Sequence, residues 1–128
     1  MKKLIISETK STPEINFNPD NNILSISGQS YPENAFKFYE PVFQWIDGYL
    51  AELHTKATVK IDFKLPYINT SSSKCIMMLL EKFDAAFLSG KNIALNWYYD
   101  VDNESELECA EEFKEDTKLS FNIVPREG

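Results

Sequence analysis

Tyr67-Ile68-Asn69-Thr70-Ser71-Ser72-Ser73-Lys74 lies between the clearest strand pattern of this chain and a long helix pattern. Before it, Val59, Ile61 and Phe63 alternate with charged residues, which is typical of a strand with one apolar and one polar face. After it, apolar residues at three- and four-residue steps predict a helix from about Ser71 to Leu88. The stretch is therefore a strand-to-helix junction, with four hydroxyl residues in a row at the start of the helix.

These four hydroxyl residues admit two interpretations. In the simpler one, Asn69 or Thr70 is the N-cap of the helix. In the other, a hydroxyl is a phosphorylation site, because a helix N-terminus offers free N–H groups and a positive dipole end, and Lys74 lies one turn on. A phosphate there would add about two negative charges to an acidic surface and could expel an acidic or apolar partner. Residue types alone leave both interpretations open and favour the cap.

The first half of the chain shows a hairpin and then a helix. Leu4 to Ser7 is a short strand pattern, and two further strands, Glu14 to Asn18 and Asn22 to Ser27, flank a turn-rich tripeptide. Ser30-Tyr31-Pro32-Glu33 has the spacing of a capping box, so we expect a helix to start there. Pro41 should kink or divide that helix. Its expected apolar stripe consists of Phe36, Tyr39, Phe43, Ile46, Leu50 and Leu53.

The second half repeats the alternation of strand and helix. Lys91 to Tyr99 is a strand pattern, an acidic segment with a short helix around Ala110 follows, and a strand containing Phe121 ends the chain. The strands alternate, so one face of the sheet should be open to water. Right-handed crossovers on one face advance the strands in one direction. We therefore predict an α/β fold, one domain over residues 1–128: a mixed β-sheet with an N-terminal hairpin and helices mainly on one face, that is, a singly wound β-α superhelix.

The charge and the cysteines restrict the partners and the compartment. The 128 residues carry a net charge of -7, from 13 basic and 20 acidic residues. This argues against nucleic acid and an anionic membrane surface as partners and leaves room for a basic protein partner. Cys75 and Cys109 are far apart, the apolar run at the start of the chain ends at Ser7, and no stretch is long enough to span a bilayer. We expect a cytoplasmic, reduced, soluble domain.

Enzyme and metal signatures are weak. His54 is the one histidine, and the four glycines form no phosphate loop. The acidic segment has the spacing of a calcium loop, but Ser105 stands where the central glycine belongs and a strand precedes it. We interpret this segment as a solvated acidic face or a docking surface and expect no metal and no cofactor. The residues at the calcium-loop spacing are Asp100, Asp102, Glu104, Glu106 and Glu111.

Trp97-Tyr98-Tyr99-Asp100 is a second candidate site, because exposed aromatic residues at a strand end would form a ligand platform. More often such residues pack on helices. Tyr98 should point away from Trp97 and Tyr99, so one of these two sets is expected to be exposed.

Four separated motifs, in order, resemble the SiaC family of regulatory phosphoproteins. They are Ser30-Tyr31-Pro32-Glu33-Asn34-Ala35-Phe36, Asn69-Thr70-Ser71-Ser72-Ser73-Lys74, Asn96-Trp97-Tyr98-Tyr99-Asp100 and Glu111-Glu112-Phe113. The resemblance implies a fold similar to STAS domains and anti-sigma-factor antagonists. It also implies a non-catalytic bacterial signalling protein. Its unphosphorylated form would bind and activate a diguanylate cyclase, raising cyclic-di-GMP and favouring biofilm formation.

The resemblance also implies which residues form the site. The phospho-acceptor falls on Thr70, with Ser71 as the nearest alternative, and a serine/threonine kinase and a PP2C-type phosphatase would add and remove the phosphate. Lys64 and Lys74 are compatible with holding it. The residues expected at the phosphate site or the partner interface are Asn69, Ser71, Ser72, Ser73, Lys74, Tyr31, Pro32, Glu33, Asn34, Tyr98, Tyr99 and Asp100.

Two alternatives remain. A partner-switching protein similar to anti-sigma-factor antagonists would release a sigma factor and would co-purify with an anti-sigma kinase. A small-ligand-binding domain would show a concave apolar pocket beside Tyr98 or Tyr99. An exposed edge strand would allow a homodimer.

Overall fold

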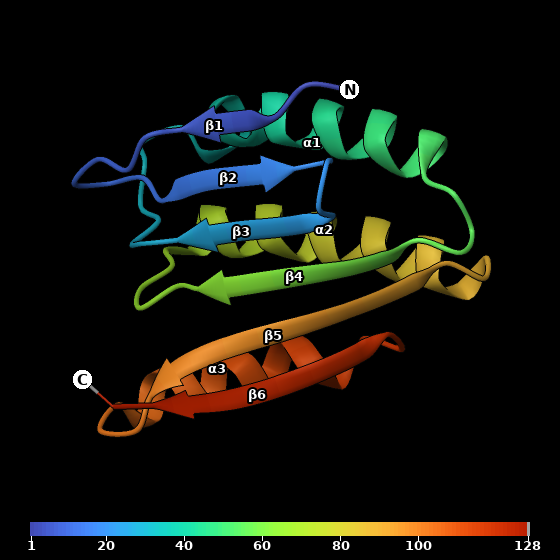
Figure 1. The fold of residues 1–128 in the computed structure, drawn as a ribbon. Helices are drawn as coiled ribbons and strands as arrows, with labels where there is room; N and C mark the ends of the chain where they lie inside the picture. Colours follow the sequence, from blue (N-terminus) through green and yellow to red (C-terminus); the bar gives the residue numbers. More distant parts are fainter. Residues whose placement is uncertain (128) are drawn as a thin grey trace.

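The computed structural model, which describes residues 1–127, consists of one six-stranded sheet with three helices on one of its faces (Figure 1). The elements in chain order are β1 (Leu4–Ile6), β2 (Glu14–Asn18), β3 (Ile23–Ser27), α1 (Ala35–Glu52), β4 (Thr58–Lys64), α2 (Thr70–Leu88), β5 (Asn92–Asp100), α3 (Glu104–Glu115) and β6 (Ser120–Arg126).

The strands lie in the sheet in the same order as in the chain. β1, β2 and β3 pair antiparallel, and β3, β4, β5 and β6 pair parallel. Asn22 closes the β2–β3 turn with a φ of 57°, a left-handed conformation that asparagine tolerates better than most residues. Each helix connects two neighbouring parallel strands and packs on the same face. The predicted fold class, a mixed sheet with an N-terminal hairpin and one-sided helices, is confirmed.

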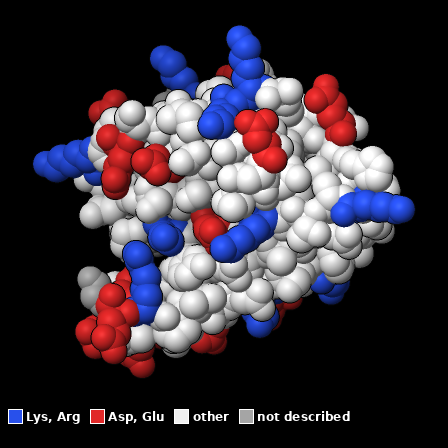
Figure 2. Space-filling model, viewed as in Figure 1, with Lys and Arg blue, Asp and Glu red and all other residues white. Residues whose placement is uncertain are grey.

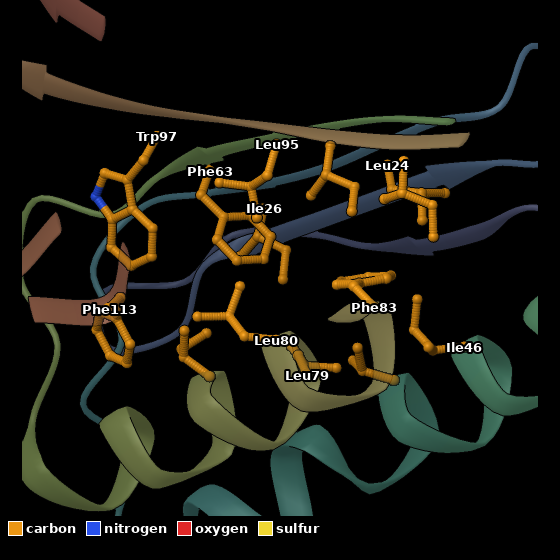
Figure 3. Packing of buried hydrophobic residues seen from close by; sticks show 14 of the residues in the cluster. Leu24, Ile26, Ile46, Phe63, Leu79, Leu80, Phe83, Leu95, Trp97 and Phe113 are labelled. Carbon is orange, nitrogen blue, oxygen red and sulfur yellow. The ribbon is translucent and has the colours of Figure 1, made fainter. Parts of the chain in front are cut away.

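The core lies between the sheet and the helices. Alternate strand residues point toward the helices, as Figure 3 shows for Leu24, Phe63 and Trp97, and these three side chains are at most 1% exposed. Leu79 and Phe83 of α2 fill the space opposite them. The apolar face of the alternating strands therefore packs on the apolar stripes of the helices, as the sequence pattern predicts.

The other face of the sheet is open and carries a polar row. Asn16, Ser25, Asp62, Asn96 and Asn122 are register partners on five neighbouring strands. The Nδ2 of Asn96 donates to Asp62 Oδ1, and the Nδ2 of Asn122 donates to Asn96 Oδ1, both at 3.2 Å. In Figure 2, basic and acidic side chains are interspersed over this side of the molecule rather than gathered into a basic stripe. This face therefore lacks the footprint of a nucleic-acid-binding surface.

The start of α1 differs from the sequence prediction. Asn34, not Ser30, is the N-cap: its Oδ1 accepts the backbone N–H of Lys37 at 3.1 Å. Ser30 instead forms a parallel β-bridge with Ile68. The capping-box prediction is wrong because this long-range pairing holds Ser30 in a β-bridge, four residues before the residue that caps the helix. Pro41 does not divide the helix, which runs from Ala35 to Glu52.

The buried stripe of α1 is also rotated from the predicted one. It consists of Ala35, Tyr39, Val42, Ile46 and Tyr49, whereas Phe36 is 50% exposed. Both sets recur with helical spacing, so periodicity could not choose between them. Packing against the sheet selects the stripe that is buried. Tyr39 and Ile46 belong to both the predicted and the observed stripe, and Ala35, rather than Phe36, is buried at the start of the helix.

Buried tyrosines make the stability of this fold sensitive to alkaline pH. Burial raises the pKa of Tyr39 and Tyr49 to about 12. The neutral phenol is favoured in the folded state, so this contribution is complete below pH 10 and is lost as the pH rises from 10 to 12. We expect Tyr39 alone to account for about 2–3 kcal/mol. Urea unfolding at pH 8, 10 and 11.5 measures how the free energy of unfolding depends on pH. Tyr39→Phe is the control, and it should make this pH dependence less steep. An equal slope for both proteins would contradict this assignment.

Candidate functional site at the start of α2

The backbone of the β4–α2 junction is held by hydrogen bonds on both sides. The N–H of Asn69 donates to Ser30 O at 2.9 Å, and the N–H of Ser30 donates to Tyr67 O at 2.8 Å. Asn69 Oδ1 accepts the N–H of Ser72 at 2.9 Å, and Asn69 O accepts the N–H of Ser73 at 2.9 Å. Asn69 is therefore the N-cap, as one of the two alternatives predicted. Thr70 is the first residue of the helix, and its side chain is exposed.

The four hydroxyl residues differ in exposure. Thr70 and Ser71 are exposed and Ser73 is half-buried, but Ser72 has no accessible surface. Ser30 Oγ donates to Ser72 Oγ at 2.8 Å, and the Tyr39 hydroxyl lies 2.7 Å from Ser30 Oγ. This buried chain of hydroxyls ties the start of α2 to α1. A modifying enzyme would have to unpack the core to reach Ser72, whereas Thr70 and Ser71 are accessible at the surface.

The two lysines suggested for a phosphate lie on different sides of the sheet. Lys74 is exposed on α2, one turn after Thr70. Lys64 is on the open face of the sheet, with its Nζ 5.2 Å from the centre of the Tyr98 ring. Since α2 packs on the opposite face, Lys74 is the better placed of the two for an anion at Thr70. The interpretation of Lys64 as a phosphate ligand finds no support in this geometry.

The segment Tyr31 to Asn34 borders the junction. The ring of Tyr31 meets the ring of Tyr67 edge to face, with centroids 5.9 Å apart, and the N–H of Tyr31 donates to Ser11 O at 2.7 Å. Pro32 is half-buried and Glu33 is exposed. The fold thus brings this predicted site segment to the loop that leads into α2.

Tyr98, Tyr99 and Asp100 lie at the end of β5. Tyr98 faces the open side of the sheet and Asp100 Oδ1 accepts the N–H of Asp102 at 2.9 Å, which forms a turn. Trp97 is 1% exposed and belongs to the core, whereas Tyr98 and Tyr99 are both half-buried, so the prediction that one of the two sets is exposed is wrong. Five surface cavities of about 180 to 520 Å³ are lined by other residues than Tyr98 and Tyr99. These five cavities therefore give the small-ligand alternative no support.

A groove between α2 and α3 was not predicted as such. This α2–α3 groove encloses about 520 Å³, and Thr70 is one of its lining residues. A signal is present in the sequence, since the acidic segment is typical of a solvated face or a docking surface, but nothing in the sequence places it beside Thr70. The residues that line the groove are Thr70, Ser73, Lys74, Met77, Cys109, Glu112, Phe113, Glu115 and Asp116.

The thiol in this groove is not an activated nucleophile. Burial, together with the smaller effect of the negative charges of Glu112 and Glu106, raises the pKa of Cys109 to about 11. The thiol therefore stays protonated near neutral pH and contributes an apolar surface.

The calcium-loop spacing does not fall on a loop. Asp100 ends β5 and Glu104 begins α3, which Asn103 caps by accepting the N–H groups of Ser105 and Glu106. Over residues 1–127, no group of three or more His, Cys, Asp or Glu side chains is placed to hold a metal ion. In the same range, no helix has the length and apolar character needed to cross a membrane.

Comparisons with known proteins agree with one another. A family model described as "SiaC family regulatory phosphoprotein" matches residues 6–126. An uncharacterised protein of Pseudomonas aeruginosa (strain UCBPP-PA14) is 38% identical over 123 residues, which cover 96% of each chain. The solved structure of SiaC of Pseudomonas aeruginosa is 36% identical with a TM-score of 0.91, over 98% of this chain and 100% of that one. A crystal structure of the diguanylate cyclase SiaD in complex with its activator SiaC, from the same organism, contains a chain that is 37% identical with a TM-score of 0.91, over 96% of this chain and 99% of that one.

Proposed function

The chain belongs to the SiaC family of regulatory phosphoproteins, and from this premise we propose that its unphosphorylated form binds and activates a diguanylate cyclase. The chain itself is non-catalytic and acts as a single domain over residues 1–128. Phosphorylation of Thr70 by a serine/threonine kinase ends the interaction, and a PP2C-type phosphatase restores it. The SiaD–SiaC complex, in which the relative activates a cyclase, supports the choice of partner.

The observation that carries this proposal is the position of Thr70. It is the first residue of α2, exposed, next to an asparagine that already serves as the cap. A phosphate on its hydroxyl would meet the positive end of the helix dipole, with Lys74 one turn on. The modification therefore requires no rearrangement of the fold, while it changes the charge on the α2 wall of the α2–α3 groove.

The test combines this chain with the purified full-length SiaD-type cyclase of the same genome. We expect the chain to increase the rate of cyclic-di-GMP formation, and the cognate kinase with ATP to remove that increase. Thr70→Ala should activate the cyclase and resist the kinase, because it lacks the acceptor. Ser71→Ala is the matched control and should still respond to the kinase.

Two results would contradict the proposal. If the chain neither binds nor activates the cyclase but co-purifies with an anti-sigma kinase, it belongs to a partner-switching system with another output. If Ser71→Ala resists the kinase while Thr70→Ala does not, the acceptor is Ser71. Phosphopeptide mass spectrometry of the kinase-treated chain separates these two assignments directly.

A further inference from the structure

The α2–α3 groove has an apolar floor and walls of opposite charge. Met77 of α2 is half-buried, Phe113 of α3 is 7% exposed, and the half-buried Cys109 lies one turn before Phe113 on α3. The α3 wall carries Glu112, Glu115 and Asp116, whereas the α2 wall carries Lys74 beside Thr70. A partner segment therefore needs apolar side chains for the floor and basic side chains for α3.

The walls of the groove also decide the conformation of its occupant. Both walls are helices, and the parallel strands beneath them are already paired, so the groove offers no free strand edge for an extended peptide. An amphipathic helix with anchors at helical spacing is the recognition mode that such a groove supports.

We propose that the α2–α3 groove receives an amphipathic helix of the cyclase, with basic side chains toward α3 and a carboxylate toward Lys74. This inference rests on the proposed function and deepens it. Charge argues for this occupant over a second copy of the chain, because a protein with a net charge of -7 would bring further negative charge to an acidic wall.

The same arrangement explains how phosphorylation acts. Thr70 and Lys74 are one turn apart on α2, and both line the groove. A phosphate on Thr70 pairs with Lys74 and repels the carboxylate of the helix, and it places about two negative charges against an apolar floor. The partner thus loses its ion pair with Lys74 while the acidic α3 wall is unchanged. Release follows from local charge at the groove, without a change of fold.

The experiment measures the affinity for the full-length SiaD-type cyclase by isothermal titration calorimetry or biolayer interferometry. Reversing two charges on the groove wall, Glu112→Lys with Glu115→Lys, should weaken binding on the order of tenfold or more. The matched control, Glu40→Lys with Glu52→Lys, makes the same change in net charge on exposed positions of α1 and should stay within about twofold. Met77→Ser tests the floor and should weaken binding without altering charge.

The outcomes distinguish this inference from the proposed function. If the wild-type chain binds the cyclase and the groove variants bind as well as the α1 control, the groove is not the docking site, although the function stands. If the wild-type chain does not bind the cyclase at all, both proposals fail. Circular dichroism and thermal unfolding of each variant show whether a loss of affinity comes from the groove or from unfolding.

Discussion

Thr70→Glu should reduce the affinity for the cyclase on the order of a hundredfold. Thr70→Gln, whose side chain has the shape of glutamate without its charge, should bind nearly as well as wild type. The reason is that Thr70 lines the α2–α3 groove one helical turn before Lys74. If a partner helix docks as proposed, a glutamate there would pair with Lys74 and repel the carboxylate of that helix. The difference between Glu and Gln therefore measures the charge effect separately from the loss of the threonine methyl and hydroxyl.

Ser71→Glu is the matched control for this experiment. Ser71 is exposed on the same helical turn but does not line the groove. An acidic residue in the first turn stabilises a helix by about 0.3–1 kcal/mol, so neither glutamate variant should be destabilised. We expect Ser71→Glu to change affinity by less than about threefold. Equal losses for Thr70→Glu and Ser71→Glu would show that the partner senses net charge rather than a local contact.

Trp97→Ala should lower the free energy of unfolding by about 3–5 kcal/mol. Trp97 is 1% exposed, and its ring lies 5.5 Å from that of Phe63, 5.1 Å from that of Phe113 and 5.9 Å from that of Phe121. Removing it leaves a cavity between β5 and α3. Because Phe113 also lines the groove, cyclase binding should weaken as well.

Tyr98→Ala, one residue further along β5, is the control. Its ring lies on the open face and contacts Lys64 rather than the core. We expect it to cost about 1 kcal/mol or less, because little of the surface it covers is apolar core. Urea unfolding of both variants provides the measurement. Similar losses for Trp97→Ala and Tyr98→Ala would mean that α3 contributes little to the cooperative fold.

The fold was predictable from the sequence because its strands alternate so regularly. Val59, Ile61 and Phe63 with charged residues between them require one covered and one open face, and single-sided crossovers then fix the strand order. What periodicity could not provide was the orientation of α1. Phe36 and Ala35 both belong to helical apolar patterns, and only packing against the sheet distinguishes them.

The site was predictable in part. Residue types placed a helix start at Asn69 or Thr70, but the choice of cap depended on a hydrogen bond from Ser72, which no composition rule supplies. The burial of Ser72 depends on Ser30, 42 residues earlier in the chain. The groove likewise depends on two helices separated by a strand. Contacts of this length are formed by tertiary packing, and local sequence carries little information about them.

The chain-ordered sheet has a consequence for synthesis. The polypeptide leaves the ribosome N-terminus first, so each strand emerges after the strand it pairs with. The nascent chain can therefore fold by adding one strand after another to the same edge of the sheet. β1 to β4 with α1 and α2 come first, and α3 and β6 come last. Thr70 is therefore presented to solvent before the acidic wall of the groove exists. A stalled or truncated chain would expose Thr70, the proposed acceptor, while lacking the acidic wall of the proposed docking groove.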